Sequence, residues 1–488
     1  METQETTSPK KPRSTAAIRA LVGPRDVVLD GIPGSQTFVN HALTRELNCS
    51  RPTVNDCRNQ FISMKTSAKL RWKISFLYVA LFALTTSLFY AADFPQWRGP
   101  QRNGVVKETG LLQEWPKDGP KLLWQVNDIG SGYSTPSIVG DRIYLLGNEG
   151  LENEFALALS TKDGSRVWSA KLGKVGNPKQ NPSYPAARST PTVEGDVLYT
   201  LGSDGDLVCL ETAKGKERWR KNLRTDFGGK HGEWAYAESP LIDGDALVCT
   251  PGGSNATIVA LNKKTGEVIW KCALPEADDA SYSSIVIADL GGVKQYVQFL
   301  SKGLVGIEAK TGKLLWRYER SAKGSPAVIV TPLVSDGYIY SGAFRASCAL
   351  VKPVTKDGAF AVEEVYSNNK LPFGLGGVVK VGDYFYGSSS KSAMCVEFKS
   401  GAVKWEESAL GPCSWLVADN RIYVHAESGE VALIEPASEA YREKGRFTPT
   451  NPPTRDQSKA WAYPVVANGR LYIRESNSLW CYDVKTAK

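Results

Sequence analysis

Histidine is scarce in this sequence, and the local motifs of common catalytic sites are missing. Only three histidines occur in 488 residues, and two of them, His231 and His425, lie beyond residue 92. The chain has no G-x-S-x-G nucleophile turn, no H-E-x-x-H metal motif and no glycine-rich phosphate loop. A glycosidase stays open, because its two carboxylates need only be neighbours in space. The sequence otherwise favours a protein that is not an enzyme, with no metal site.

Paired cysteines are also missing. Beyond residue 92 the sequence has seven cysteines, with no adjacent pair and no C-x-x-C spacing. An odd number without such spacing argues against a disulfide framework and a structural zinc site, and the absence of C-x-x-C-H excludes an attached haem. Most of these cysteines stand among apolar residues, as Cys209 and Cys481 do, so we predict buried free thiols.

A basic surface is missing from most of the chain. Of the formal charge of +8, residues 1–92 carry +6, from 12 Lys/Arg and 6 Asp/Glu. The remaining residues hold 47 basic and 45 acidic side chains, which leaves them close to neutral. This balance does not support an anionic polymer as partner, and we expect no nucleic acid to bind.

An apolar run at Ile74–Ala92 follows four basic residues, Lys65, Lys69, Arg71 and Lys73. This order is typical of a secretory signal peptide, which we place at 64–92, and it predicts export to the periplasm or beyond the cell. If the segment stays uncleaved, it would anchor the chain in the membrane. Met64 would begin such a signal, so residues 1–63 are interpreted as upstream sequence translated in error or as a cytoplasmic or disordered extension.

Two patterns alternate along residues 93–488. The first is a Gly/Asp/Asn turn followed by alternating apolar residues, as in Gly140–Tyr144 (GDRIY), and it indicates a β-hairpin. The second has an apolar residue five positions before a glycine and a Trp four positions after it, as in Leu159, Gly164 and Trp168. The hairpin copies begin at Gly140, Gly195, Gly244, Gly291, Asp336, Gly382, Asp419 and Asn468. The Trp residues of the second pattern are Trp168, Trp219, Trp270, Trp316 and Trp405.

Aromatic residues at the ends of these repeats recur every 39 to 51 residues, counted from Trp124 to Phe447. A period of this length is typical of β-propellers, in which four-stranded blades bury their faces against one another around a ring. The last hairpin lacks an outer Trp strand, while Lys121–Val126 (KLLWQV) is an outer strand without a hairpin. We therefore predict an all-β, eight-bladed propeller of four-stranded antiparallel blades over 121–488. The N-terminal strand closes its last blade.

The role of the repeated residues follows from this geometry. The turn glycines supply left-handed backbone, and the Trp residues, with Trp124, are predicted to pack between neighbouring blades as structural wedges. They are not expected to be ligand platforms.

The repeats at Ala260–Trp270 (ALNKKTGEVIW) and Gly306–Trp316 (GIEAKTGKLLW) resemble the Trp-docking repeat of pyrroloquinoline-quinone (PQQ)-type propellers. That superfamily includes quinoprotein alcohol dehydrogenases and the outer-membrane-protein assembly lipoprotein, which lacks the quinone. The lead-in 93–120 opens with Phe94–Gly104 (FPQWRGPQRNG), which resembles the start of secreted bacterial PQQ-like propellers. The resemblance implies the fold, which hosts catalysts, scaffolds and sensors alike.

The sequence departs from both named relatives. The dehydrogenases hold PQQ against two adjacent cysteines and bind calcium, and neither a Cys-Cys pair nor a calcium-ligand cluster is present here. PQQ is therefore not an expected cofactor, although it stays an alternative. The lipidated cysteine of the assembly lipoprotein is also missing.

Ligands of propellers usually approach one mouth of the central channel, so the residues just before each inner strand are the candidates. The richest segment is Gly228–Pro240, and the candidate site consists of Arg188, His231, Trp234, Tyr236 and Glu238, with Tyr133 on the first blade. Arg188 and Glu238 are expected on adjacent blades, where they could form an ion pair. The alternative interpretation is a packed loop with a structural role.

The leading hypothesis is an exported binding or scaffolding propeller of the cell envelope, without enzymatic activity, whose protein, small-molecule or glycan ligand binds at the channel. The alternatives are a PQQ-dependent oxidoreductase and a sensor propeller related to those fused to kinases.

Overall fold

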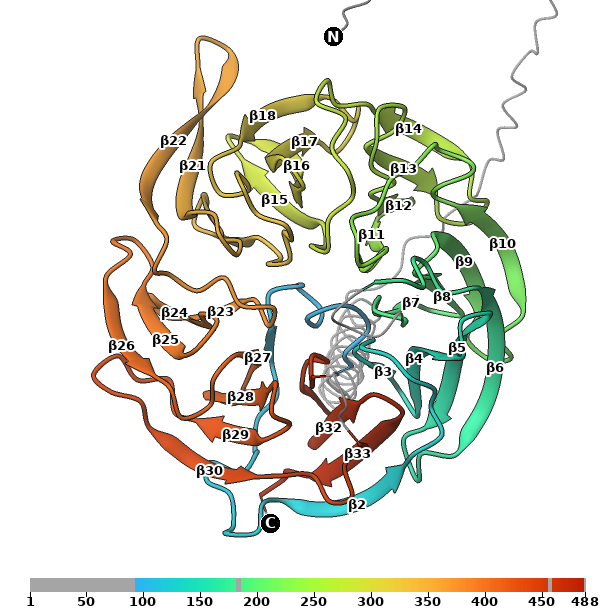
Figure 1. Ribbon diagram of the computed structural model, residues 1–488, viewed down its shortest axis with the longest axis vertical. Helices are drawn as coiled ribbons and strands as arrows, with labels where there is room; N and C mark the ends of the chain where they lie inside the picture. The colour runs from blue at the N-terminus through green and yellow to red at the C-terminus, as the bar shows by residue number, and fades with distance from the viewer. Residues whose placement is uncertain (1–92, 181–185, 455–458, 487–488) are drawn as a thin grey trace, which may run out of the picture. The chain divides into compact units, whose positions relative to one another are not determined.

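The structure is a computed structural model that describes residues 93–180, 186–454 and 459–486, and their regular secondary structure is entirely β-strand. The predicted signal segment 64–92 and extension 1–63 lie outside these residues. Figure 1 shows the strands grouped into blades around a ring. Blades 1 to 4 are β3 Ser137–Val139, β4 Arg142–Glu149, β5 Asn153–Ser160, β6 Arg166–Gly173; β7 Thr192–Glu194, β8 Val197–Leu201, β9 Asp206–Glu211, β10 Glu217–Asn222; β11 Leu241–Asp243, β12 Ala246–Cys249, β13 Ile258–Asn262, β14 Val268–Cys272; and β15 Val286–Leu290, β16 Val293–Leu300, β17 Gly303–Glu308, β18 Leu314–Tyr318. Blades 5 to 8 are β19 Leu333–Ser335, β20 Tyr338–Ser341, β21 Cys348–Lys356, β22 Ala359–Asn368; β23 Val378–Val381, β24 Tyr384–Ser388, β25 Ala393–Glu397, β26 Val403–Glu407; β27 Cys413–Ala418, β28 Arg421–Ala426, β29 Val431–Ile434, β30 Glu443–Phe447; and β31 Val465–Ala467, β32 Arg470–Glu475, β33 Ser478–Asp483 with β2 Lys121–Val126.

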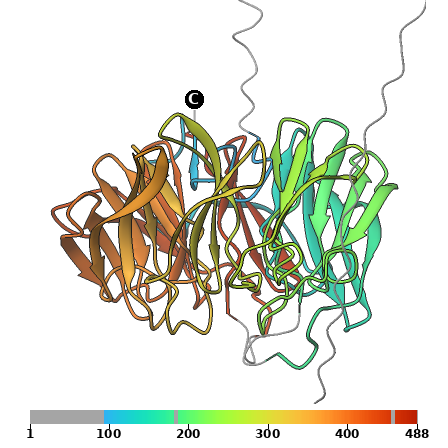
Figure 2. The same ribbon diagram turned by 90° about the horizontal axis from the view of Figure 1, so that it is seen from above.

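The blades confirm the predicted eight-bladed propeller. Each consists of four antiparallel strands from the centre outward, which are consecutive in the chain in blades 1 to 7, and blade 7 gains β1 Val105–Val106 as a parallel fifth strand. Figure 2 shows the propeller from the side, with the strands running between its two faces. None of the described elements is a helix that could span a membrane.

Blade 8 is closed by the N-terminal strand, as predicted. β2 pairs antiparallel with β33, and Trp124 stands opposite Cys481. The fully buried Arg474 of β32 then ties this blade to blade 1, because its guanidinium donates to the carbonyl oxygens of Ser134 (2.8 Å) and Leu146 (2.7 Å). The first strand after the lead-in, β2, thus completes the same sheet as the last strand, β33. This pairing closes the ring and removes the open strand edges that an unclosed ring would leave.

The outer-strand aromatics pack under the turn glycine of the next blade. A Cβ added to Gly215 would lie 2.5 Å from Cε3 of Trp168, and the Trp168 indole N–H donates to the Thr212 carbonyl at 2.8 Å. These contacts explain why the repeat needs glycine there, with φ at +66°. The same arrangement joins Trp124 to Gly164, Trp219 to Gly266, Trp270 to Gly312, and Tyr366 to Gly401.

Trp316 departs from this arrangement. Blade 5 has a long hairpin, β21–β22, in place of the short glycine turn. The Trp316 indole therefore packs on Gly306 of its own blade, and its N–H donates to the Gln295 side chain at 2.6 Å.

The seven cysteines of the described residues are free and buried, which confirms the prediction. They contribute to apolar clusters that lie between neighbouring blades, such as the cluster in which Cys209 and Tyr199 of blade 2 meet Leu247 of blade 3. Since each cluster draws on at least two adjacent blades, the ring is stabilised by contacts between neighbours.

Candidate binding site at the channel mouth

The lead-in before β1 crosses the centre of the ring, where Figure 1 shows it in blue. Phe94 pairs with Ile138 of blade 1. Further along, the Trp97 indole donates to the Thr331 hydroxyl of blade 5 at 3.1 Å, and β1 then joins blade 7. Residues 94–106 therefore contact blades from both halves of the ring.

Two buried arginines strengthen these contacts. Arg102 donates to the carbonyl oxygens of Ser239 (2.8 Å) and Pro240 (3.1 Å) ahead of blade 3. Arg98 donates to the carbonyl oxygen of Val378 in blade 6 and to that of Asn103 at 3.0 Å. Burial lowers the pKa of both, that of Arg102 to about 10, which leaves Arg102 a cation at neutral pH. The W-R-G-P motif thus belongs to a central brace.

A cavity of about 450 Å³ lies beside this brace. Its wall is mainly aromatic and is contributed by the lead-in, by the loops that enter the blades and by loops between their second and third strands. The aromatic side chains are Trp97, Tyr133, Trp234, Tyr282, Phe344, Phe373, Trp461 and Tyr463. The volume falls within the range of small-molecule and cofactor pockets.

The aromatic rings are arranged in pairs. Trp97 meets Tyr463 edge to face at 4.5 Å between centroids, and Tyr133 lies 4.9 Å from Trp461. Several of their polar groups already have protein partners: the Tyr463 hydroxyl donates to the Leu375 carbonyl, and the Trp461 indole donates to Glu427 at 3.0 Å. The wall therefore offers chiefly apolar ring surface, which suits an apolar or aromatic group.

Charged side chains interrupt this wall at two places. The Arg188 guanidinium lies 4.8 Å from the centre of the Tyr133 ring and donates to the Gln180 side chain at 2.8 Å. Burial lowers its pKa. At the second place, Lys459 pairs with Glu427 at 2.8 Å.

The structure divides the residues proposed from sequence into two groups. Arg188, Trp234 and Tyr133 line the cavity. His231 and Tyr236 do not: their rings lie 5.2 Å apart, and the buried Tyr236 hydroxyl donates to the Pro251 carbonyl at 2.8 Å. These two pack the loop ahead of blade 3.

Glu238 is buried beneath the cavity wall. Its carboxylate accepts hydrogen bonds from the Thr250 amide (2.7 Å) and hydroxyl (3.0 Å), and the nearby cation that acts on it is Arg102. Burial raises its pKa to about 7. The suggested ion pair between Glu238 and Arg188 is therefore not what holds Glu238, which instead belongs to the packing around the brace.

Six aromatic wall residues were missed by the sequence reasoning: Trp97, Tyr282, Phe344, Phe373, Trp461 and Tyr463. Four of them precede inner strands, as Trp234 does, so a systematic search for aromatics before each inner strand could have found Tyr282, Phe373, Trp461 and Tyr463. Phe344 lies in a turn between β20 and β21, and Trp97 lies before the first blade.

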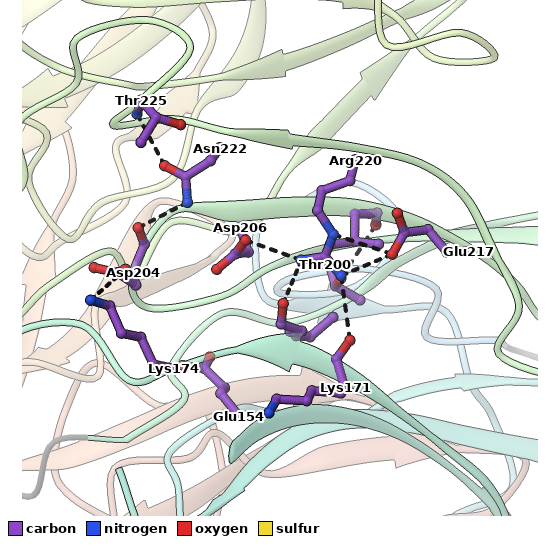
Figure 3. A network of polar contacts seen from close by, with 12 residues as sticks. Glu154, Lys171, Lys174, Thr200, Asp204, Asp206, Glu217, Arg220, Asn222 and Thr225 are labelled. Atoms are coloured by element: carbon purple, nitrogen blue, oxygen red, sulfur yellow. Dashed lines mark hydrogen bonds and ion pairs between the residues drawn. The ribbon is translucent and has the colours of Figure 1, made fainter. Parts of the chain in front are cut away.

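A second polar cluster lies between blades 1 and 2 (Figure 3). Asp206 pairs with Arg220 at 3.0 Å, and the fully buried Glu154 accepts a hydrogen bond from the Ser203 amide at 2.9 Å. Burial raises the pKa of Glu154 to about 7. Because Glu154 of blade 1 contacts Ser203 of blade 2, this cluster joins the two blades.

The cavity does not fit PQQ as the dehydrogenase resemblance would have it. No cysteine lines the wall, and within the described ranges no group of three or more His, Cys, Asp or Glu side chains could hold a metal ion. The adjacent cysteines and the calcium ligands of those enzymes thus have no counterpart there.

Fold and cavity together define a PQQ-like β-propeller with a ligand-sized, aromatic pocket at the centre of its ring. A family model described as outer membrane protein assembly factor BamB matches residues 152–407, and the chain belongs to this family. BamB of Yersinia pestis is 25% identical over 248 residues, covering 47% of this chain and 57% of that protein. The chain spans about half the length of the curated relatives it matches.

Other similarities are more limited. The serine/threonine-protein kinase AfsK of Streptomyces griseus is 26% identical over 168 residues, covering 34% of this chain and 19% of the kinase. The crystal structure of BamB from Moraxella catarrhalis is 15% identical and covers 75% of this chain and 98% of that one, with a TM-score of 0.52. At this identity the structural similarity shows the shared fold alone.

Proposed function

We propose that this protein is an exported, non-enzymatic binding propeller of the cell envelope, and that its ligand or partner inserts an apolar group into the aromatic cavity. The observation that carries the proposal is the cavity itself, about 450 Å³ in volume and walled by eight aromatic side chains. Buried aromatic surface of this kind is typical of binding pockets. Neither of the described histidines lines it.

The family supports the location and the role. The name of the family, outer membrane protein assembly factor, places such proteins in the envelope, and the signal peptide predicted at 64–92 would serve as the export signal. A scaffold or assembly role needs a surface that recognises a partner, and the propeller provides a rigid one.

Filling the cavity tests the proposal. In Ala327→Trp a large side chain would occupy the pocket, whereas Ala327→Ser leaves it open and serves as the control. Full-length wild type and both variants would be titrated with peptides that contain a single phenylalanine, by calorimetry. We expect binding to the wild type and to Ala327→Ser, and at least tenfold weaker binding to Ala327→Trp. Equal binding to all three would refute the cavity as the site.

A second experiment on the wild-type protein tests the alternative that it is a PQQ-dependent oxidoreductase. PQQ and calcium would be added to the full chain, which is then desalted and examined for a bound chromophore. Stoichiometric retention together with alcohol oxidation would replace the proposal by a quinoprotein oxidoreductase.

A further inference from the structure

Four exposed basic residues follow one side of the cavity mouth: Lys323, Arg345, Lys370 and Lys391. We call them the basic arc. Each lies one to three residues from a wall residue of the cavity, Arg345 next to Phe344 and Lys391 next to Ser390. Their loops lead into or connect the strands of blades 5 and 6.

Contacts between these loops bring the four residues together. A Cβ on Gly324, next to Lys323, would lie 3.9 Å from the Arg345 carbonyl oxygen. The Phe344 and Phe373 rings lie 5.9 Å apart, and the Phe373 amide donates to the Ser388 carbonyl at 3.1 Å, which connects this loop to the turn that carries Lys391. The basic arc therefore follows one continuous edge of the cavity.

The charges of the basic arc are not compensated. None of its four side chains forms an ion pair with any residue that the structure describes, whereas many exposed arginines elsewhere do, such as Arg218 with Asp196 at 2.5 Å. The acidic group of the cavity wall, Glu427, is already bound to Lys459 and Trp461.

Among the described residues, Glu233 and Asp279 lie within three positions of the wall residues Trp234 and Tyr282, on the loops that lead into blades 3 and 4. The loops of blades 5 and 6 carry the four cations of the basic arc beside the cavity. A bound chain that carries negative charge would be attracted to this edge.

We propose that the cavity and the basic arc together bind an acidic polypeptide segment, which places one aromatic or large apolar side chain in the cavity and its carboxylates along the basic arc. This inference rests on the proposed function and specifies its partner. The aromatic wall supplies the anchor site, because burying one ring of the partner removes apolar surface from water on both sides. The basic arc sets the preference for acidic sequences and makes association depend on salt.

The experiment measures fluorescence anisotropy of labelled peptides with the full-length protein. The acidic peptide has one phenylalanine between glutamates, the neutral peptide replaces the glutamates by glutamine, and a third peptide replaces the phenylalanine by alanine. We expect the acidic peptide to bind about tenfold more tightly than the neutral one, and the difference to shrink when salt rises from about 20 to about 200 mM.

Charge reversal locates the effect. Arg345→Glu combined with Lys391→Glu should weaken the acidic peptide about tenfold and leave the neutral one unchanged. The matched control is Lys310→Glu with Lys313→Glu, two exposed lysines in the turn between β17 and β18, on the opposite face. All four positions are exposed, so both variants should fold as the wild type does.

Three results would overturn the inference. Equal affinity for the acidic and neutral peptides would remove the basic arc but leave the cavity as a site. Full binding of the peptide without phenylalanine would show that negative charge alone suffices and that no anchored side chain is needed. If neither phenylalanine peptide binds, the proposed function fails together with the inference.

Discussion

The central brace makes a quantitative prediction at Arg102. The substitution Arg102→Met keeps most of the aliphatic packing but removes three hydrogen bonds, to the carbonyl oxygens of Ser239 and Pro240 and to the Gln96 side chain. The Pro240 carbonyl still accepts a hydrogen bond from the Thr192 hydroxyl, whereas the Ser239 carbonyl loses the hydrogen bond from Arg102. The substitution also leaves the buried Glu238 without its nearby cation.

Removing one partner from a buried, charged network typically costs about 3–5 kcal/mol, because the remaining groups stay desolvated. We expect Arg102→Met to lower the free energy of unfolding by about that amount. The assay is guanidinium denaturation followed by tryptophan fluorescence, at a pH near neutral where Arg102 is charged.

The control is Lys107→Met in the same lead-in, where the lysine is exposed and the change should stay within about 0.5 kcal/mol. If Arg102→Met unfolds at the same denaturant concentration as Lys107→Met, then the lead-in does not brace the ring, and the reasoning from buried hydrogen bonds is refuted.

Three further predictions concern the joints between blades, the buried carboxyl groups and the thiols. Gly215→Ala should destabilise the protein by about 3 kcal/mol, because the new methyl group would displace Trp168. The control, Gly195→Ala, also has a positive φ (+59°) but has no atom within 4 Å of the new Cβ, so it should cost only about 1 kcal/mol. Equal losses of unfolding free energy in the two variants, measured by denaturation, would contradict the docking role of Trp168. Burial raises the pKa of Glu154 from 4.5 to about 7, so the folded state holds this proton more tightly, and its contribution to stability is complete below pH 4.5 and declines by about 3 kcal/mol as the pH rises to about 7. The variant Glu154→Gln should lack this decline, and a wild type and variant with parallel pH profiles would show that Glu154 does not titrate this way. The seven cysteines of the propeller should resist a thiol reagent at pH 8 in the native protein, because burial shields them and raises the pKa of thiols such as that of Cys348, to about 12. All seven should react after denaturation. Rapid labelling of Cys348 in the native protein, located by mass spectrometry, would contradict its burial.

The sequence was informative about the fold because the repeat is local. The glycine that must adopt a positive φ and the Trp four residues later occur in one short segment, so their spacing can be counted without knowing the fold. The pairing of β2 with β33 could also be inferred, because one blade lacked a strand that the N-terminus possessed.

The candidate site was only partly accessible to such reasoning. Arg188 and Trp234 could be placed near the channel from their position before an inner strand, whereas the roles of Tyr236 and Glu238 depend on burial beneath the wall. The hydrogen bond between Trp97 and Thr331 joins residues that are 234 positions apart, so no local sequence pattern predicts it.

The sequence by itself determined the all-β class, the eight blades, the closing strand and the free thiols, because turn chemistry and strand alternation act between near neighbours. Only the tertiary structure decided that the lead-in braces the centre of the ring, that the cavity is aromatic, and that the basic arc lies along its edge. These features combine single residues from different blades, and closing the ring is what brings them together.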